Sequence, residues 1–367
     1  MLPARTKHAT KRVVSALQQP RHCLTPFSSL SSLRHRLTGR RLPLFYDYLT
    51  PQQSHLLNLS LDAFVASPQR PSSGRDHASA VTLPSVLKPT PMPVGHHLVY
   101  FPPQVPSSQL LPDGTDKLHF PGSPFNRRMW AGGWVRFYDE GGPLLNGQRA
   151  VCMEGIRDVS VKGKEGEEKI FVGVERRVAV VGEGEEDEHV RARVWTENED
   201  ERGDAIVVER RNLVFMRDRT SEEIELAREA SAVPRKAARA PANPEFSHTL
   251  IPSRSLLFRY SALTFNAHSI HLNPGYAQNV EGYHDVLVHG PLTLTLMLTV
   301  IQNHLSDIGQ IVRGIEYRNL APLFVEQQMR ICAKPKGSGA GAWDIWVEGG
   351  DGGLAVKGTI HAENLKA

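Results

Sequence analysis

Apolar residues recur along this chain with two different spacings, which separate predicted strands from predicted helices. Apolar runs with some alternation, rich in Val, Ile and aromatic residues, are typical of strands. They occupy residues 129–138, 150–161, 168–181, 205–217, 311–319, 327–334, 343–348 and 354–362. Helical spacing of apolar residues predicts helices over residues 45–65, 222–230 and 291–305. Two groups of strands that are each accompanied by helices indicate an α+β fold.

A polar segment interrupts this pattern in the second half. Residues 259–265 have the composition of a strand, and three polar side chains, Asn266, His268 and His271, follow within six positions. Asn273-Pro274 then predicts a turn. Amide and imidazole groups in one short loop suit hydrogen bonding and proton transfer.

A glycine and a proline mark the beginning of the longest apolar helix. Pro291 favours the first helical turn, where its missing N–H costs nothing. The N–H of Gly290 would then lie at a helix start, where a free donor and the helix dipole both favour negative charge. A histidine loop and such a donor together supply a proton-transfer group and a donor for a developing oxyanion, as acyl chemistry requires.

A short correspondence between the halves indicates duplication. In the first half, Pro143-Leu144-Leu145-Asn146-Gly147-Gln148 follows a strand with Arg136 and precedes a strand with Cys152. In the second half, Pro322-Leu323-Phe324-Val325-Glu326-Gln327 lies in the same way between Arg318 and Cys332. We therefore expect two copies of one helix-plus-sheet unit. The first copy has no counterpart of residues 266–271, so we expect it to be structural and the second copy to be catalytic.

The frame Asn266-Ala-His268-Ser-Ile-His271, with the later Val288-His289-Gly290-Pro291, resembles the motif of the hot-dog hydratases and dehydratases, the MaoC-like enzymes. These enzymes add or remove water across the 2,3 bond of acyl thioesters. Their usual motif has an Asp, then Asn-Pro, then a His five positions after the Asp. The stretch is most similar to the two-part fungal mitochondrial 3-hydroxyacyl-thioester dehydratases and the related mesaconyl-type hydratases. Asn266 stands where the family usually has Asp.

The resemblance runs from about residue 42 to the C-terminus and implies a double hot-dog, with two helix-wrapped antiparallel sheets in one chain. We expect an N-terminal degenerate hot-dog domain over residues 42–217, with a Pro- and Ser-rich loop insertion at 66–95. An Ala- and Pro-rich linker at 218–248 precedes the expected catalytic hot-dog domain at 249–367.

Charge is unevenly distributed along the chain. The net charge of +4 arises in residues 1–46, which hold nine basic residues and no acidic one, whereas the remainder has 34 basic and 39 acidic residues. Because the body is mildly acidic, the composition does not favour nucleic-acid binding. A leader rich in Arg and Ser without an apolar core predicts a mitochondrial targeting segment, placed at 1–41, although a disordered basic tail remains an alternative. No apolar run is long enough for a membrane span.

Within the site, we assign His271 to proton transfer, Asn266 to positioning the hydroxyl or water, and the Gly290 N–H to the oxyanion. His268 and His289 are secondary candidates. A neutral amide at 266 can orient water but cannot accept its proton. Either His271 acts alone, a carboxylate such as Glu281 or Asp285 enters the site, or activity has been lost.

The thioester carrier would be coenzyme A or the phosphopantetheine arm of an acyl carrier protein. Candidate basic residues for its path are Arg254, Arg259, Arg313 and Lys334. The pair Arg127-Arg128 could also meet a phosphate, although an exposed pair is the more ordinary interpretation. No metal is expected, because His268, His271 and His289 lack a Cys or carboxylate ligand in the usual arrangement. The adjacent His96-His97 predicts a strand edge, and no cofactor is implied.

The resemblance implies conversion of a (3R)-hydroxyacyl-ACP or -CoA to the trans-2-enoyl thioester, in mitochondrial type II fatty-acid synthesis in the matrix. A mesaconyl-CoA-type hydratase, a thioesterase and a non-catalytic acyl-binding scaffold are the alternatives. The chain would be a monomer built as a pseudo-dimer, or a homodimer.

Overall fold

The computed structural model describes residues 26–65, 81–138, 142–232, 238–337 and 341–365. The described helices are α1 (Pro26–Thr38), α2 (Pro51–Leu61), the short 3-10 helices η1 (His96–Val99) and η2 (Ser107–Gln109), α4 (Asp187–Val194), α5 (Ser221–Ala232), α6 (Arg254–Leu263), α7 (Ser269–Leu272), α8 (Pro274–Asn279) and α9 (Gly290–Asp307). The strands are β1 (Leu44–Tyr48), β2 (Arg127–Phe137), β3 (Arg149–Lys162), β4 (Lys169–Val180), β5 (Val207–Met216), β6 (Phe246–Leu250), β7 (Gln310–Asn319), β8 (Met329–Pro335), β9 (Ala342–Glu348) and β10 (Leu354–Asn364).

The strands form one ten-stranded antiparallel sheet in the order β1-β3-β4-β5-β2-β7-β10-β9-β8-β6. Read from either edge toward the middle, the two halves have the same order, because β6-β8-β9-β10-β7 repeats β1-β3-β4-β5-β2. The central pair β2 and β7 joins the halves, with Trp134 opposite Glu316. The predicted double hot-dog is confirmed, and its two sheets are continuous across the β2–β7 pair.

The repeated sequence motif lies on equivalent strands of the two halves. Arg136 is on β2 and Arg318 on β7, while Cys152 is on β3 and Cys332 on β8. Each pair occupies the same place in the repeated strand order. The correspondence seen in the sequence therefore has a structural counterpart.

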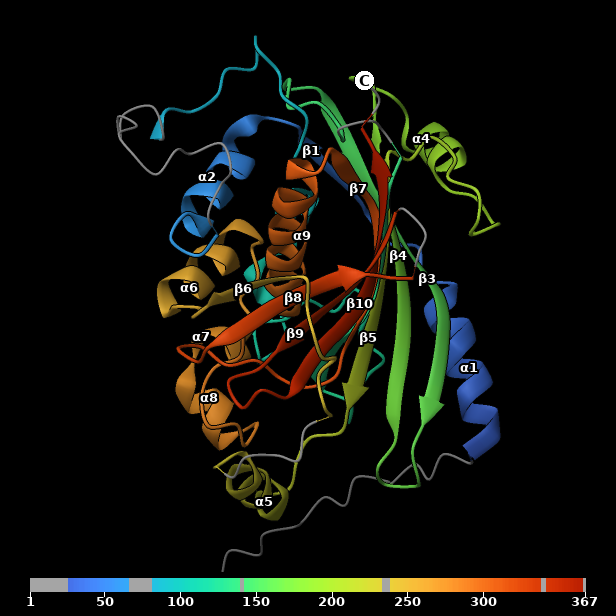
Figure 1. The fold of residues 1–367 in the computed structure, drawn as a ribbon. Coiled ribbons are helices and arrows are strands. Elements are labelled where there is room, and N and C mark those ends of the chain that lie inside the picture. The colour runs from blue at the N-terminus through green and yellow to red at the C-terminus, as the bar shows by residue number, and fades with distance from the viewer. Residues whose placement is uncertain (1–25, 66–80, 139–141, 233–237, 338–340, 366–367) are drawn as a thin grey trace, which may run out of the picture.

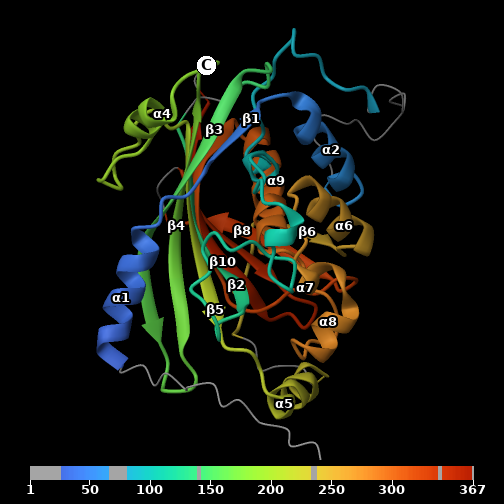
Figure 2. The same ribbon diagram turned by 180° about the vertical axis from the view of Figure 1, so that it is seen from behind.

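The halves differ in their helices. In the second half, α9 runs along the sheet, and ten of its residues are buried, including Leu292, Leu296 and Ile301. Between β1 and β2 of the first half, the part of the chain that the structure describes contains α2, η1 and η2 but no helix of comparable length. Helices α2, α6, α7, α8 and α9 lie on one face of the sheet, and α1 and α4 lie on the other (Figures 1 and 2). None of the described helices is long and apolar enough to cross a bilayer.

Helix α1 packs firmly against the first half of the sheet. Leu37 is fully buried and Leu42 is 3% exposed, in a cluster with residues of β3, β4 and β5. Arg40 donates hydrogen bonds to the carbonyl oxygens of Lys117, Leu118 and Phe120. Helix α1 lies within the predicted targeting segment 1–41 and packs on the sheet, and the end of that segment at 41 stays a prediction. Residues 1–25 of that segment lie outside the described residues.

The predicted type of secondary structure is wrong for two segments. Residues 259–265 belong mainly to α6, because Leu256, Leu257 and Tyr260 recur at helical spacing on its buried face and the Ser253 hydroxyl caps its start. Residues 45–48 belong to β1, which pairs with β3, and the helix begins only at Pro51. In both cases tertiary contacts select between two short apolar patterns that sequence alone does not separate.

The structure corrects two further expectations and bears on a third. His96 and His97 form the buried helix η1, which follows Gly95 at φ +86°, rather than a strand edge. The predicted boundary at 249 falls inside β6, so the second half of the sheet begins at Phe246. Part of the loop predicted at 66–95, residues 66–80, lies outside the described residues, and residues 81–91 are exposed.

Candidate active site

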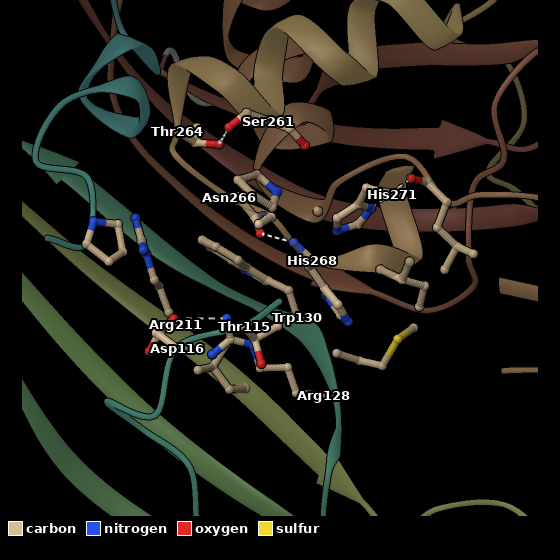
Figure 3. Close-up of a pocket in the computed structure, with 18 of the residues that line it drawn as sticks. Thr115, Asp116, Arg128, Trp130, Arg211, Ser261, Thr264, Asn266, His268 and His271 are labelled. Atoms are coloured by element: carbon tan, nitrogen blue, oxygen red, sulfur yellow. Dashed lines mark hydrogen bonds and ion pairs between the residues drawn. The ribbon is translucent and has the colours of Figure 1, made fainter. Parts of the chain in front are cut away.

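A cavity of about 760 Å³ lies between the two halves of the protein. Its walls are largely apolar, with Leu98, Phe101 and Leu213 from the first half. This volume is in the range of pockets that bury a small organic ligand. Four of the seven catalytic candidates from the sequence line it, namely Asn266, His268, His271 and Gly290. Figure 3 shows the first three approaching Trp130, while Thr115, Asp116, Arg128 and Arg211 approach from the first half.

The loop that carries the polar residues is shaped by its own hydrogen bonds. After α6 the backbone turns at Phe265, which has φ +51°. The Asn266 Oδ1 accepts a hydrogen bond from the His268 N–H at 3.0 Å, and His268 is the residue that precedes α7. The Nδ2 amide can donate to a ligand, and Oδ1 keeps a second lone pair.

His271 is held in one tautomer by the backbone. Its Nδ1 lies 2.8 Å from the Leu287 carbonyl oxygen, which can only accept, so the proton is on Nδ1 and Nε2 carries the lone pair. The ring stacks on His289, with centroids 3.8 Å apart. Burial lowers the pKa of His271 to about 4, and the charge of Arg128 adds to that effect. His271 is therefore a neutral acceptor at pH 7.

His289 supports this arrangement and precedes the oxyanion candidate. It is fully buried, its Nε2 lies 2.8 Å from the Ser261 hydroxyl, and burial lowers its pKa well below the usual value. Gly290 is the first residue of α9, so its N–H has no acceptor within the helix. A Cβ atom at residue 290 would lie 3.1 Å from the Cβ of Trp130. Glycine thus lets the helix start approach Trp130 closely.

Strand β2 of the first half supplies the opposite wall. The Trp130 indole N–H donates to the Tyr317 hydroxyl at 2.7 Å, and the Trp130 carbonyl accepts from the Asn319 amide at 2.8 Å. Arg128 pairs with Asp116 at 3.1 Å. Burial alone would raise the pKa of Asp116, but Arg128 holds it below its usual range. The expectation that the first half is only structural is wrong, because it contributes charged groups to the cavity.

Neither carboxylate proposed from the sequence lines the cavity. Glu281 is buried in an ion pair with Arg127 at 2.8 Å. Asp285 pairs with Arg254 at 2.6 Å. The carboxylates that line it are Asp116 and Glu154. They come from residues far away in sequence, so closeness along the chain gave no signal for them.

None of the basic residues predicted for the carrier path lines the cavity. Arg254 pairs with Asp285, Arg313 pairs with Glu363, Lys334 reaches a backbone carbonyl, and Arg259 is on the exposed side of α6. The cations that line the cavity are Arg128, Lys169, Arg176 and Arg211. The Arg127-Arg128 pair was the one sequence signal for this group, and both of its members are in ion pairs.

Two of these cations belong to a buried charge network in the first half. Arg176 pairs with Glu154 at 2.6 Å and with Glu209 at 3.3 Å. Arg211 pairs with Glu209 at 2.7 Å and lies over the Trp130 ring. Charge on this wall is therefore compensated within the protein. In the described part of the chain, no group of three or more His, Cys, Asp or Glu residues could hold a metal ion.

Comparison with known sequences agrees with this architecture. Residues 95–325 match the profile of the hydroxyacyl-thioester dehydratase type 2 family. The chain is 30% identical over 297 residues to a mesaconyl-C(4)-CoA hydratase of Chloroflexus aurantiacus, covering 77% of this chain and 91% of that protein. It is 29% identical over 280 residues to the mitochondrial hydroxyacyl-thioester dehydratase type 2 of Schizosaccharomyces pombe, covering 75% and 86%.

Solved structures support the fold. A MaoC-like dehydratase from Phytophthora capsici has a TM-score of 0.53 at 12% identity, covering 90% of this chain and 98% of that one. The peroxisomal multifunctional enzyme type 2 of Drosophila melanogaster has a TM-score of 0.51 at 12% identity, covering 87% and 48%. From the profile match and the sequence relatives together, the chain belongs to the hydroxyacyl-thioester dehydratase type 2 family.

Proposed function

We propose that this protein is a hydro-lyase that interconverts 3-hydroxyacyl thioesters and 2-enoyl thioesters. The observation that carries the proposal is that His271 and Gly290 line one apolar cavity. The first offers an unprotonated nitrogen and the second a free N–H at a helix start. Membership of the dehydratase family supports the same reaction.

The Gly290 N–H would bind the thioester oxygen. When a proton leaves C2, charge develops on that oxygen as an enolate. A helix N-terminus stabilises it, because its N–H groups lack acceptors and its dipole is positive at this end.

His271 would carry the transferred proton. In dehydration its Nε2 takes the C2 proton, and the C–H electron pair passes into the enolate that the Gly290 N–H stabilises. This pair then forms the C2–C3 π bond as the C3–O bond breaks. The imidazolium then protonates the departing hydroxyl, which leaves as water and restores the neutral ring. Because burial lowers the pKa of His271 to about 4, the imidazolium releases its proton readily.

Asn266 would hold the oxygen of the hydroxyl or water. The hydrogen bond from the His268 N–H to Oδ1 fixes the side chain, and its Nδ2 can donate to a lone pair of the substrate or water oxygen. A carboxamide cannot take a proton at neutral pH. We therefore assign it to positioning, and assign the proton itself to His271.

More specific proposals concern the stereochemistry of the substrate, the group that carries the acyl chain and the location of the reaction in the cell. We propose a (3R)-hydroxyacyl substrate and a trans-2-enoyl product, carried on coenzyme A or an acyl carrier protein, in fatty-acid synthesis in the mitochondrial matrix. Support comes from a relative named as mitochondrial and from the acid-free leader. Lys169 is an exposed cation in the cavity lining, suited to a carrier phosphate.

A mesaconyl-type hydratase is the second candidate, because charged groups form part of the cavity wall. Arg176, Arg211 and Glu154 would suit an acyl chain with a polar end better than a long alkyl chain. The relative from Chloroflexus aurantiacus is named for such a substrate.

The test is a substrate panel with the purified full-length chain. We expect crotonyl-CoA to lose its enoyl absorbance and 3-hydroxyacyl-CoA to gain it, without release of free thiol. Faster turnover of mesaconyl-CoA than of any unsubstituted enoyl-CoA would select the second candidate. Thiol release would indicate a thioesterase, and tight acyl-CoA binding without turnover would overturn the enzymatic assignment.

A further inference from the structure

A loop of the first half, residues 111–116, packs against the segment that carries His268 and His271. The carbonyl of Asp113 accepts a hydrogen bond from the Ser269 N–H at 2.8 Å. Gly114 has φ +84°, and a Cβ atom there would lie 2.2 Å from the carbonyl oxygen of Ala267. Only glycine lets the loop approach this closely, so the position of the loop relative to the histidines is fixed by backbone contacts.

The loop brings a buried carboxylate to His268. Asp113 is 6% exposed, and its Oδ1 accepts hydrogen bonds from the Thr115 N–H at 2.9 Å and the Thr115 hydroxyl at 2.7 Å. Its Oδ2 has no hydrogen-bond donor among the described residues. That oxygen lies 3.5 Å from the Nε2 of His268. A buried acceptor without a donor is costly, and a proton on the Nε2 of His268 would supply that donor.

We propose that Asp113 is a positioning residue that holds the proton of His268 on Nε2, so that the His268 Nδ1 accepts a hydrogen bond from the substrate hydroxyl. In the reverse direction the same nitrogen would accept one hydrogen of the attacking water. The other hydrogen of that water passes to His271 and then to C2. The water hydrogen that is donated to the His268 Nδ1 stays bonded to the oxygen and becomes the hydrogen of the product hydroxyl, so atoms and protons balance.

This arrangement explains how a site with Asn266 in place of an acidic residue can still orient water. Asn266 donates to the oxygen and His268 accepts from it, so two partners fix its direction. Both histidines must be neutral, and burial lowers the pKa of His268 well below its usual value. The charged and titratable groups around His268 are Asp113, His271, His289 and Arg128. The inference rests on the proposed function, but its structural part can be tested without turnover.

The test compares Asp113→Asn with the parent enzyme. The variant keeps an Oδ1 for Thr115 and places an amide N–H toward His268, which favours the proton on Nδ1 of the ring. We expect kcat for crotonyl-CoA hydration to fall about 10- to 100-fold, with KM within about twofold. Asp113→Glu should recover part of the loss. The matched control is Asp285→Asn, whose carboxylate pairs with Arg254 away from the cavity, and it should retain parental kcat.

Nitrogen-15 chemical shifts of the His268 ring provide a readout independent of activity. They should show the proton on Nε2 in the parent and on Nδ1 in Asp113→Asn, with assignment from His268→Gln. A proton on the Nδ1 of His268 in the parent enzyme would overturn the inference. The inference would also be overturned if Asp113→Asn kept the parental kcat while His271→Gln was inactive. That result would leave the proposed function intact. An inactive parent would refute the function, and the tautomer measurement would still decide the role of Asp113.

Discussion

Replacing His271 with Gln is the most direct test of the proposed chemistry. Glutamine is similar in length and can still donate to the Leu287 carbonyl, which His271 contacts at 2.8 Å. It has no nitrogen lone pair that can accept a proton near neutral pH. The change therefore removes proton transfer and retains most of the local packing.

The expected loss can be estimated from the role of the residue. A positioned general acid or base contributes about 10²- to 10⁴-fold to the rate, or roughly 3–5 kcal/mol of transition-state stabilisation. We expect kcat/KM to fall by at least about a hundredfold, with the loss mainly in kcat. Binding should persist, because the Gly290 N–H and the apolar wall are unchanged.

The pH dependence gives a second check on the same residue. Because burial lowers the pKa of His271 to about 4, its neutral form prevails from pH 6 to pH 8. The parental rate should therefore show no titration near the ordinary histidine value of about 6.5. The assay is crotonyl-CoA hydration followed by absorbance. A His271→Gln enzyme with near-parental turnover, or a parental rate that rises through pH 6.5, would refute the reasoning.

Three other outcomes are expected. Gly290→Ala should lower kcat/KM about tenfold, because its Cβ meets Trp130 at 3.1 Å, and unchanged kinetics would contradict this. Removing residues 1–41 should reduce the free energy of unfolding by about 1.5–3 kcal/mol, because the buried Leu37 is lost, and a denaturant midpoint equal to that of the full chain would count against the packing of α1. The free energy of unfolding should fall as pH drops below about 6.5, by up to about 5 kcal/mol per pH unit. A denaturant midpoint that does not change from pH 7 to pH 5.5 would contradict this acid effect.

The sign of the acid effect follows from four buried histidines whose folded-state pKa lies below the unfolded value, namely His96, His97, His268 and His289. The unfolded chain binds protons at these groups first as pH falls, so acid favours unfolding. For His96 the folded pKa is about 3 and for His97 about 4, so their contribution is lost progressively between about pH 6.5 and pH 3–4.

The sequence by itself determined eight of the ten described strands and the duplication. Long runs with β-branched and aromatic residues placed β3, β4, β5, β7 and β10 within a few positions, because local composition and sheet packing favour the same conformation there. The segment from Asn266 to His271 and the helix start at Gly290 were also identifiable, because their chemistry lies in contiguous residues. The short element before that segment was given the wrong type, since its spacing allowed both a helix and a strand.

Only the tertiary structure decided what faces those residues. The β2–β7 pair and the loop at residues 111–116 bring Arg128, Asp113 and Asp116 to the histidines from more than a hundred residues away. The carboxylates and cations nearer in sequence, such as Asp285 and Arg254, neutralise one another outside the cavity. Sequence fixes the chemistry of a loop, but partners across a sheet depend on strand order and register, which arise from packing of the whole chain.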